Sequence, residues 1–214
     1  MDFIQFRKKY SNYPFIKAQD VLASAAKATQ PMRNQLTRWK KNGLLIQLRR
    51  GIYILNENDR KVFPSRFFFA NQIIWPSYVS LESALGHYGL IPEAVKSVTS
   101  VTLKKTVRFN NKAGEYIYQH IKPEAFRGYH SFKDEAGLNV FIAEPEKAAV
   151  DFFYLNLGKF KRTTGDIFKD SYRFQNTEIL NRKKIAIYAR AFKNKKLEDV
   201  SREFCEFVKE EKND

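Results

Sequence analysis

The fold of this chain is decided by residues 29–55, which read TQPMRNQLTRWKKNGLLIQLRRGIYIL. Three large apolar side chains recur at helical spacing in the first half of the stretch: Met32, Leu36 and Trp39. Pro31 suits the first turn of a helix, and Asn42-Gly43 suits its end. The spacing then changes to short β-type runs. The stretch therefore predicts a helix followed by a β-hairpin over residues 44–55, with Arg49-Arg50-Gly51 as the turn.

Two shorter helices are expected before this stretch. The first opens at Asp2, ends before Pro14, and has three aromatic side chains on one face: Phe3, Phe6 and Tyr10. The second covers about residues 17–25 and buries Val21 and Leu22. Three helices followed by a hairpin are the order of a winged helix-turn-helix, which we expect to occupy residues 1–60.

The third helix also has a polar face that contains no acid. It carries six hydrogen-bonding side chains: Arg33, Asn34, Thr37, Arg38, Lys40 and Lys41. Guanidinium and amide groups can pair with guanine and adenine edges in the major groove, while lysines and hydroxyls can hold phosphates. On an isolated helix such a face is most often merely solvated. Beside a hairpin turn that carries Arg49 and Arg50, it predicts binding to double-stranded DNA at an operator or promoter.

The charge of the chain favours the same kind of partner. The formal net charge is +15 and the pI is about 9.8, which indicates a polyanionic partner. Residues 1–60 hold 12 basic and 4 acidic residues, so more than half of the excess lies in the predicted DNA-binding segment. A second basic block lies far along the chain: Arg182, Lys183, Lys184, Arg190, Lys193, Lys195 and Lys196. This block is either a solvated helix face, against which the acidic residues after position 197 could fold, or a second nucleic-acid contact.

The remainder, residues 61–214, is expected to form a second, α+β domain. Helices are expected over residues 62–75 and from Ser80 as N-cap, followed by a small, mostly antiparallel sheet over residues 97–142. From Glu144 the chain is expected to be helical to its end, apart from a loop over residues 158–164. The predicted fold class is therefore α+β, with an N-terminal winged helix-turn-helix and C-terminal helices.

No pattern in the sequence indicates an enzyme, a metal site or a cofactor. The single cysteine and three separated histidines lack the spacing of a zinc site, and the phosphate-loop and nucleophile-elbow patterns are missing. Asp134-Glu135 fits a hairpin turn, and the acids around Pro145 fit a helix start. A nuclease and an RNA-binding protein remain open as alternatives. With no apolar run of about 18 residues and no signal segment, a cytoplasmic protein is expected, with no membrane association.

Four motifs taken in order resemble the AbiEi antitoxin family of bacterial abortive-infection systems. They are residues 42–53 (NGLLIQLRRGIY), 78–85 (YVSLESAL), 89–93 (GLIPE) and 145–148 (PEKA). The resemblance covers most of residues 1–155. It implies a winged helix that represses its own operon, a C-terminal antitoxin domain, and a type IV toxin-antitoxin pairing. In such a pairing the partner is a nucleotidyltransferase toxin that is counteracted without a stable complex. We expect a monomer in solution, or two copies on inverted repeats of the promoter.

Overall fold

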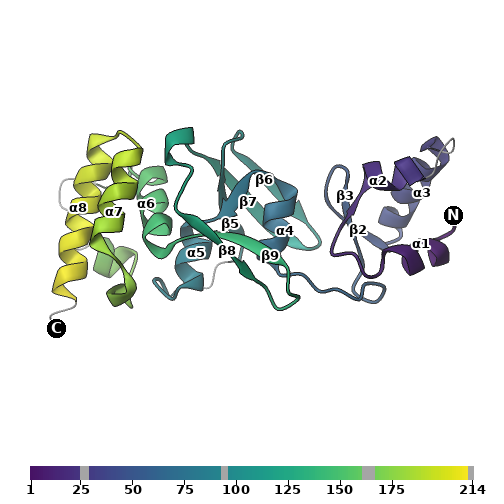
Figure 1. Ribbon diagram of the computed structural model, residues 1–214, viewed down its shortest axis with the longest axis horizontal. Helices are drawn as coiled ribbons and strands as arrows, with labels where there is room; N and C mark the ends of the chain where they lie inside the picture. Colours follow the sequence, from purple (N-terminus) through teal and green to yellow (C-terminus); the bar gives the residue numbers. More distant parts are fainter. Residues whose placement is uncertain (25–28, 93–95, 161–166, 212–214) are drawn as a thin grey trace.

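The computed structural model describes residues 1–24, 29–92, 96–160 and 167–211. Three groups of elements follow one another along an elongated molecule, with α1 at one end and α8 at the other (Figure 1). The first group comprises α1 (Phe3–Tyr10), β1 (Ile16–Lys17), α2 (Ala18–Ser24), α3 (Thr29–Lys41), β2 (Leu45–Arg49) and β3 (Ile52–Leu55).

The first group confirms the three predicted helices and the hairpin. Asp2 caps α1 by accepting a hydrogen bond from the backbone N–H of Gln5 at 2.8 Å, and the Gln5 side chain accepts one from the Asp2 N–H. The helix ends at Tyr10, before Pro14. The second helix buries Val21 and half-buries Leu22, and Ala25, where it was expected to end, lies outside the described residues.

A small core holds these helices together. Phe6 and Trp39 are buried with ring centroids 4.8 Å apart, and they lie in one apolar cluster with Met32 and Leu36 of α3. The three apolar positions predicted for the third helix are therefore confirmed as its buried face.

The hairpin belongs to a three-stranded antiparallel sheet in the order β1-β3-β2, in which β3 is the central strand. Gly51 adopts a positive φ of 83° in its turn, a backbone conformation that favours glycine. Strand β1, which was not predicted, pairs Ile16 with Tyr53. A strand of two residues is too short to show an alternating pattern in the sequence, so β1 could not be predicted from it.

The second group is built on a six-stranded sheet. It comprises α4 (Arg66–Ile73), β4 (Ser77–Val79), α5 (Leu81–His87), β5 (Val98–Thr102), β6 (Val107–Asn111), β7 (Gly114–His120), η1 (Pro123–Ala125), β8 (Tyr129–Lys133) and β9 (Asn139–Ala143). The strand order is β6-β7-β5-β4-β9-β8.

The sheet is larger than predicted, and it is mixed: three of its five pairings are antiparallel, as expected, and two are parallel. Strand β4 pairs antiparallel with β5 but parallel with β9, and β5 pairs parallel with β7. Strand β4 has only three residues and is buried throughout, so it showed no alternation between the two helices that flank it. The helix expected over residues 62–75 is shorter, since α4 begins after Pro64 at the N-cap Ser65.

The third group is helical and confirms the expected change after Glu144 in part. It comprises α6 (Pro145–Leu155), η2 (Ile167–Ser171), η3 (Thr177–Ile179), α7 (Arg182–Ala191) and α8 (Lys195–Glu210). Residues 172–176 are not helical, and residues 161–164 of the predicted loop lie outside the described part of the chain. Helix α8 packs against α7, and both cover α6 at the end of the molecule remote from α3 (Figure 1).

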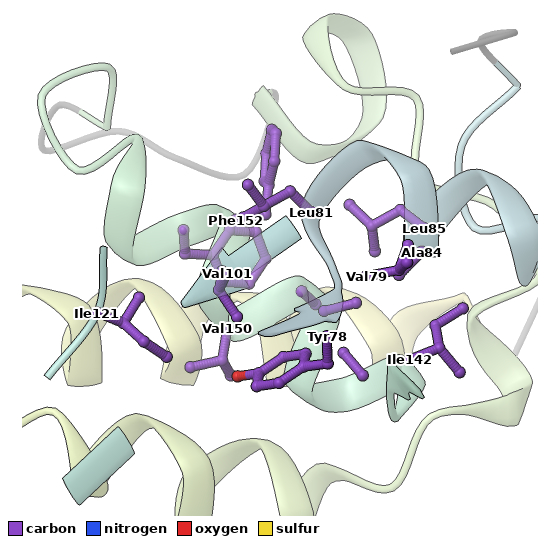
Figure 2. Close-up of a cluster of buried hydrophobic side chains, with 14 of the residues drawn as sticks. Tyr78, Val79, Leu81, Ala84, Leu85, Val101, Ile121, Ile142, Val150 and Phe152 are labelled. Carbon is purple, nitrogen blue, oxygen red and sulfur yellow. The ribbon is translucent and has the colours of Figure 1, made fainter. Parts of the chain in front are cut away.

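One large core joins the sheet to α5 and α6. Figure 2 shows part of it, with Val79 and Ile142 from two paired strands and Val150 and Phe152 from α6. This core also contains three residues of the N-terminal hairpin: Leu48, Ile52 and Ile54. The hairpin therefore contributes one face to the small core and the other face to the large one.

Candidate nucleic-acid interface

The polar face of α3 is exposed to solvent. All six predicted residues on it are exposed, from Arg33 to Lys41, while the opposite face is buried against α1. Because positions 33, 34, 37, 38 and 41 recur at helical spacing, their side chains form one continuous strip.

Four basic side chains of this region are available for an outside partner. Within the described residues, the side chains of Arg33, Arg38, Lys41 and Arg50 form no ion pair and no hydrogen bond. An uncompensated cluster of like charges raises the energy of the protein alone, and an anion bound there relieves it.

The remaining polar residues of the strip are held by neighbours. Thr37 donates to the carbonyl of Arg33 at 3.0 Å, and Gln30 donates to Oδ1 of Asn34 at 3.1 Å. Lys40 reaches across to β2 and donates to Oε1 of Gln47 at 2.9 Å. Lys40 therefore helps to fix α3 on the sheet, in addition to any contact with a ligand.

The two arginines of the hairpin turn have different surroundings. Arg50 is exposed. Arg49 is half-buried, and its Nε is buried without a hydrogen-bond partner in the described part of the protein. Burial raises the pKa of Tyr118, a residue of β7, and the charge of Arg49 acts against this rise. Arg49 is therefore less accessible to an outside partner than Arg50.

A bulge explains why the sequence did not reveal this. Between Gln47 and Arg49 the pairing of β2 with β3 shifts by one residue, so simple alternation fails at Leu48. Leu48 then packs into the large core of the second group. There the side-chain amide of Asn111 donates to the Leu48 carbonyl at 2.9 Å.

The segment that connects the first two groups also lies close to α1. Asp59 pairs with Arg7 at 3.1 Å, and the N–H of Lys61 donates to the Ser11 carbonyl at 2.8 Å. The chain after the hairpin is thus tied back to the first helix. The charge of Arg7 is compensated, unlike that of the α3 strip.

The residues of the second basic block have different surroundings in the structure. Lys184 is paired with Glu144 at 2.7 Å, and this hydrogen bond raises the pKa of Lys184. Lys193 is exposed after α7. Arg182 and Lys183 line a groove between α7 and α8. Of the four candidates for a second contact, Arg182 and Lys183 therefore border the groove, Lys184 is held by Glu144, and Lys193 is exposed beyond α7.

The acids and the lysine near Pro145 are buried or used locally. Lys147 and Asp151 form an ion pair one turn apart on α6, and both side chains are about 1% exposed or less. Asp151 also accepts hydrogen bonds from Ser80 and Tyr78, at 2.8 and 3.1 Å. Burial lowers the pKa of Lys147 and raises that of Asp151. The pair is closed to a substrate.

Ser80 precedes α5 as predicted, but its hydroxyl does not cap the helix. It binds Asp151 instead.

The prediction for Asp134 is confirmed: its carboxylate accepts hydrogen bonds from the backbone N–H groups of Ala136, Leu138 and Ser65. The ring of His87 stacks on Phe132 with centroids 5.3 Å apart.

In the described ranges no group of three or more histidine, cysteine or acidic residues is placed to hold a metal ion, and no helix is long and apolar enough to cross a membrane. Comparison with models of known protein families finds none that matches this chain, and comparison with curated protein sequences finds no relative.

Proposed function

We propose that this protein is a DNA-binding transcriptional repressor whose residues 1–60 are a winged helix-turn-helix. The observation that carries the proposal is the exposed, acid-free strip on α3, followed directly by a hairpin with the unpaired Arg50 at its turn. The element order α1-β1-α2-α3-β2-β3 and the sheet order β1-β3-β2 support it.

In this proposal α3 enters the major groove. Arg33, Asn34, Thr37 and Arg38 approach base edges, since the first turns of a recognition helix lie deepest. Lys40 and Lys41 at the end of the helix, and Arg50 in the hairpin, contact phosphates. Occupying the promoter represses transcription without any chemistry on the DNA, so no catalytic residue or cofactor is assigned.

We further propose that the repressor is an antitoxin of the AbiEi kind that regulates its own operon in the cytoplasm. The support is the resemblance of the four motifs to that family, together with the structural role of one motif. Residues 145–148 start α6 and supply Lys147 to the buried network that joins α6 to β4 and α5. The functional partner is a nucleotidyltransferase toxin that forms no stable complex with this chain.

The test is a pair of binding curves, on the DNA upstream of the gene and on a scrambled duplex, at fixed salt. The unaltered protein should prefer the upstream DNA. The variant Arg33→Ala/Arg38→Ala should lose that preference. The matched control Lys105→Ala/Lys209→Ala also removes two exposed positive charges, but far from α3, and should keep it.

Three outcomes would contradict the proposal. One is equal affinity of the unaltered protein for both duplexes. Another is tighter binding to single strands than to duplex, which would favour the RNA-binding alternative. The third is metal-dependent cleavage of the DNA, which would favour the nuclease.

A further inference from the structure

A groove with a volume of about 410 Å³ lies between α7 and α8. It is at the opposite end of the molecule from α3 (Figure 1). Its size is that of a pocket for a small molecule, and it is too small to receive a nucleic-acid duplex.

Small side chains on both helices create the hollow. Ala186 and Ala189 of α7 face Ser201 and Cys205 of α8 across it. Positions three or four residues apart on a helix share a face, so each helix presents two small residues where large ones would normally fill the space. The floor is consequently a mixture of apolar and weakly polar surface.

Long cationic side chains surround this floor. They are Arg182, Lys183, Arg190 and Arg202, against one acid in the lining, Glu198. Arg202 is paired with Asp199 at 3.2 Å. The side chains of Arg182, Lys183 and Arg190 have no ion pair within the described ranges, so the lining contains three unpaired positive charges against the single acid Glu198.

A polar group beneath the groove is also without a partner. Ser201 is 2% exposed, and its hydroxyl forms no hydrogen bond among the described residues. Leaving a buried hydroxyl unpaired is unfavourable, and such groups usually bind a water or a ligand. This observation is independent of the charge on the rim.

We propose that the groove binds a free nucleoside triphosphate, with its phosphates on Arg182, Lys183 and Arg190. Guanidinium groups bind phosphate oxygens through paired hydrogen bonds, and three uncompensated cations suit a triphosphate better than a single phosphate. The alanines and Cys205 give the base or sugar an uncharged floor. The proposal does not depend on DNA binding by α3.

The test is calorimetric titration of the full chain with ATP, GTP, CTP and UTP, with inorganic triphosphate, and with a short single-stranded oligonucleotide. At least one nucleoside triphosphate should bind, and more tightly than inorganic triphosphate. The proposal is overturned if none binds at about 1 mM, a concentration at which weak sites are still filled. It is also overturned if only the oligonucleotide binds.

Three variants locate the site. Arg190→Ala should weaken binding about tenfold or more, because a charged hydrogen bond is lost. Ala186→Leu fills the groove without changing any charge and should have a similar effect. Lys196→Ala removes an exposed charge outside the lining and should change affinity less than about twofold.

Equal losses for Arg190→Ala and Lys196→Ala would show a diffuse charge effect and overturn the assignment, as would unchanged binding by folded Ala186→Leu. Binding to promoter DNA should be the same for Arg190→Ala as for the unaltered protein. The two proposals can therefore fail separately.

Discussion

Asn111 donates a hydrogen bond from its side-chain amide to the backbone carbonyl of Leu48, and its Oδ1 accepts one from the N–H of Ala113. The first bond joins β6 to β2, and the second shapes the turn between β6 and β7. A single side chain therefore links the hairpin of the N-terminal group to the six-stranded sheet.

Replacing Asn111 should loosen this junction. Asn111→Ala leaves the Leu48 carbonyl and the Ala113 N–H without these partners, and we expect a loss of about 1–3 kcal/mol in the free energy of unfolding. Chemical denaturation followed by tryptophan fluorescence measures it. The adjacent Asn110 is exposed, and Asn110→Ala should cost clearly less. Equal losses of stability for the two variants would mean that the turn, and not the hydrogen bond to Leu48, accounts for the effect.

The two arginines of the hairpin turn should differ in the salt dependence of DNA binding. Arg50→Ala should lower the slope of log affinity against log salt by about 0.9, the value for one phosphate contact. Arg49→Ala should change the slope less, since Arg49 is half-buried and its Nε is buried. Salt titrations on one duplex compare them directly. An equal decrease of the slope for Arg49→Ala would show that this guanidinium also contacts a phosphate.

Sequence preference should reside on the first turns of α3. Asn34→Ala or Arg38→Ala should cost about 1–3 kcal/mol on promoter DNA and much less on a scrambled duplex. Lys41→Ala at the helix end should weaken both alike. Paired binding curves at one salt concentration separate the two effects. Equal losses of binding free energy on both duplexes for Asn34→Ala and Arg38→Ala would mean that α3 contacts only phosphates.

Trp39 should dominate the stability of the N-terminal group. It is 3% exposed and packs on Phe6 and Phe3, so Trp39→Ala should cost about 3–5 kcal/mol. Tyr13, an aromatic residue of the same group that is 55% exposed, serves as control, and Tyr13→Ala should stay within about 1 kcal/mol. Thermal or urea unfolding provides both values, and similar losses of stability for the two variants would contradict the burial of Trp39 in the core.

The buried pair on α6 should respond differently from a surface pair. Lys147→Met leaves Asp151 buried without its cation and should cost about 3–5 kcal/mol, much of which Lys147→Met/Asp151→Leu should recover. Lys184→Met breaks the partly exposed pair with Glu144 and should cost about 1 kcal/mol or less. Urea unfolding of the four proteins tests this. A double variant as unstable as Lys147→Met would mean that Ser80 and Tyr78 require the carboxylate.

Local sequence patterns were sufficient to predict most of the structure of the N-terminal group. The apolar face of α3, the cap at Asp2 and the glycine in the hairpin turn depend on residues within one or two turns of each other, so their structure could be predicted from sequence. The exposure of the six α3 residues followed from the same helical spacing.

The failures involve partners that are distant in the sequence. The hydroxyl of Ser80 binds a carboxylate 71 residues away, although the sequence around it resembles an ordinary helix start. Strand β4 is defined by its neighbours β5 and β9 rather than by its own three residues. The strand pairing shifts at a bulge between Gln47 and Arg49, and the groove between α7 and α8 exists only once the two helices pack.

The hairpin that gives one face to each core has a consequence for how such a protein can evolve. Recombination that joined residues 1–60 to a different second domain would leave Leu48, Ile52 and Ile54 facing water or an ill-fitting surface. Exchange of residues 1–60 as a cassette is therefore disfavoured. If the protein is the DNA-binding repressor proposed above, a new operator preference is more readily acquired by point substitutions along the exposed strip of α3, whose side chains lie outside the core.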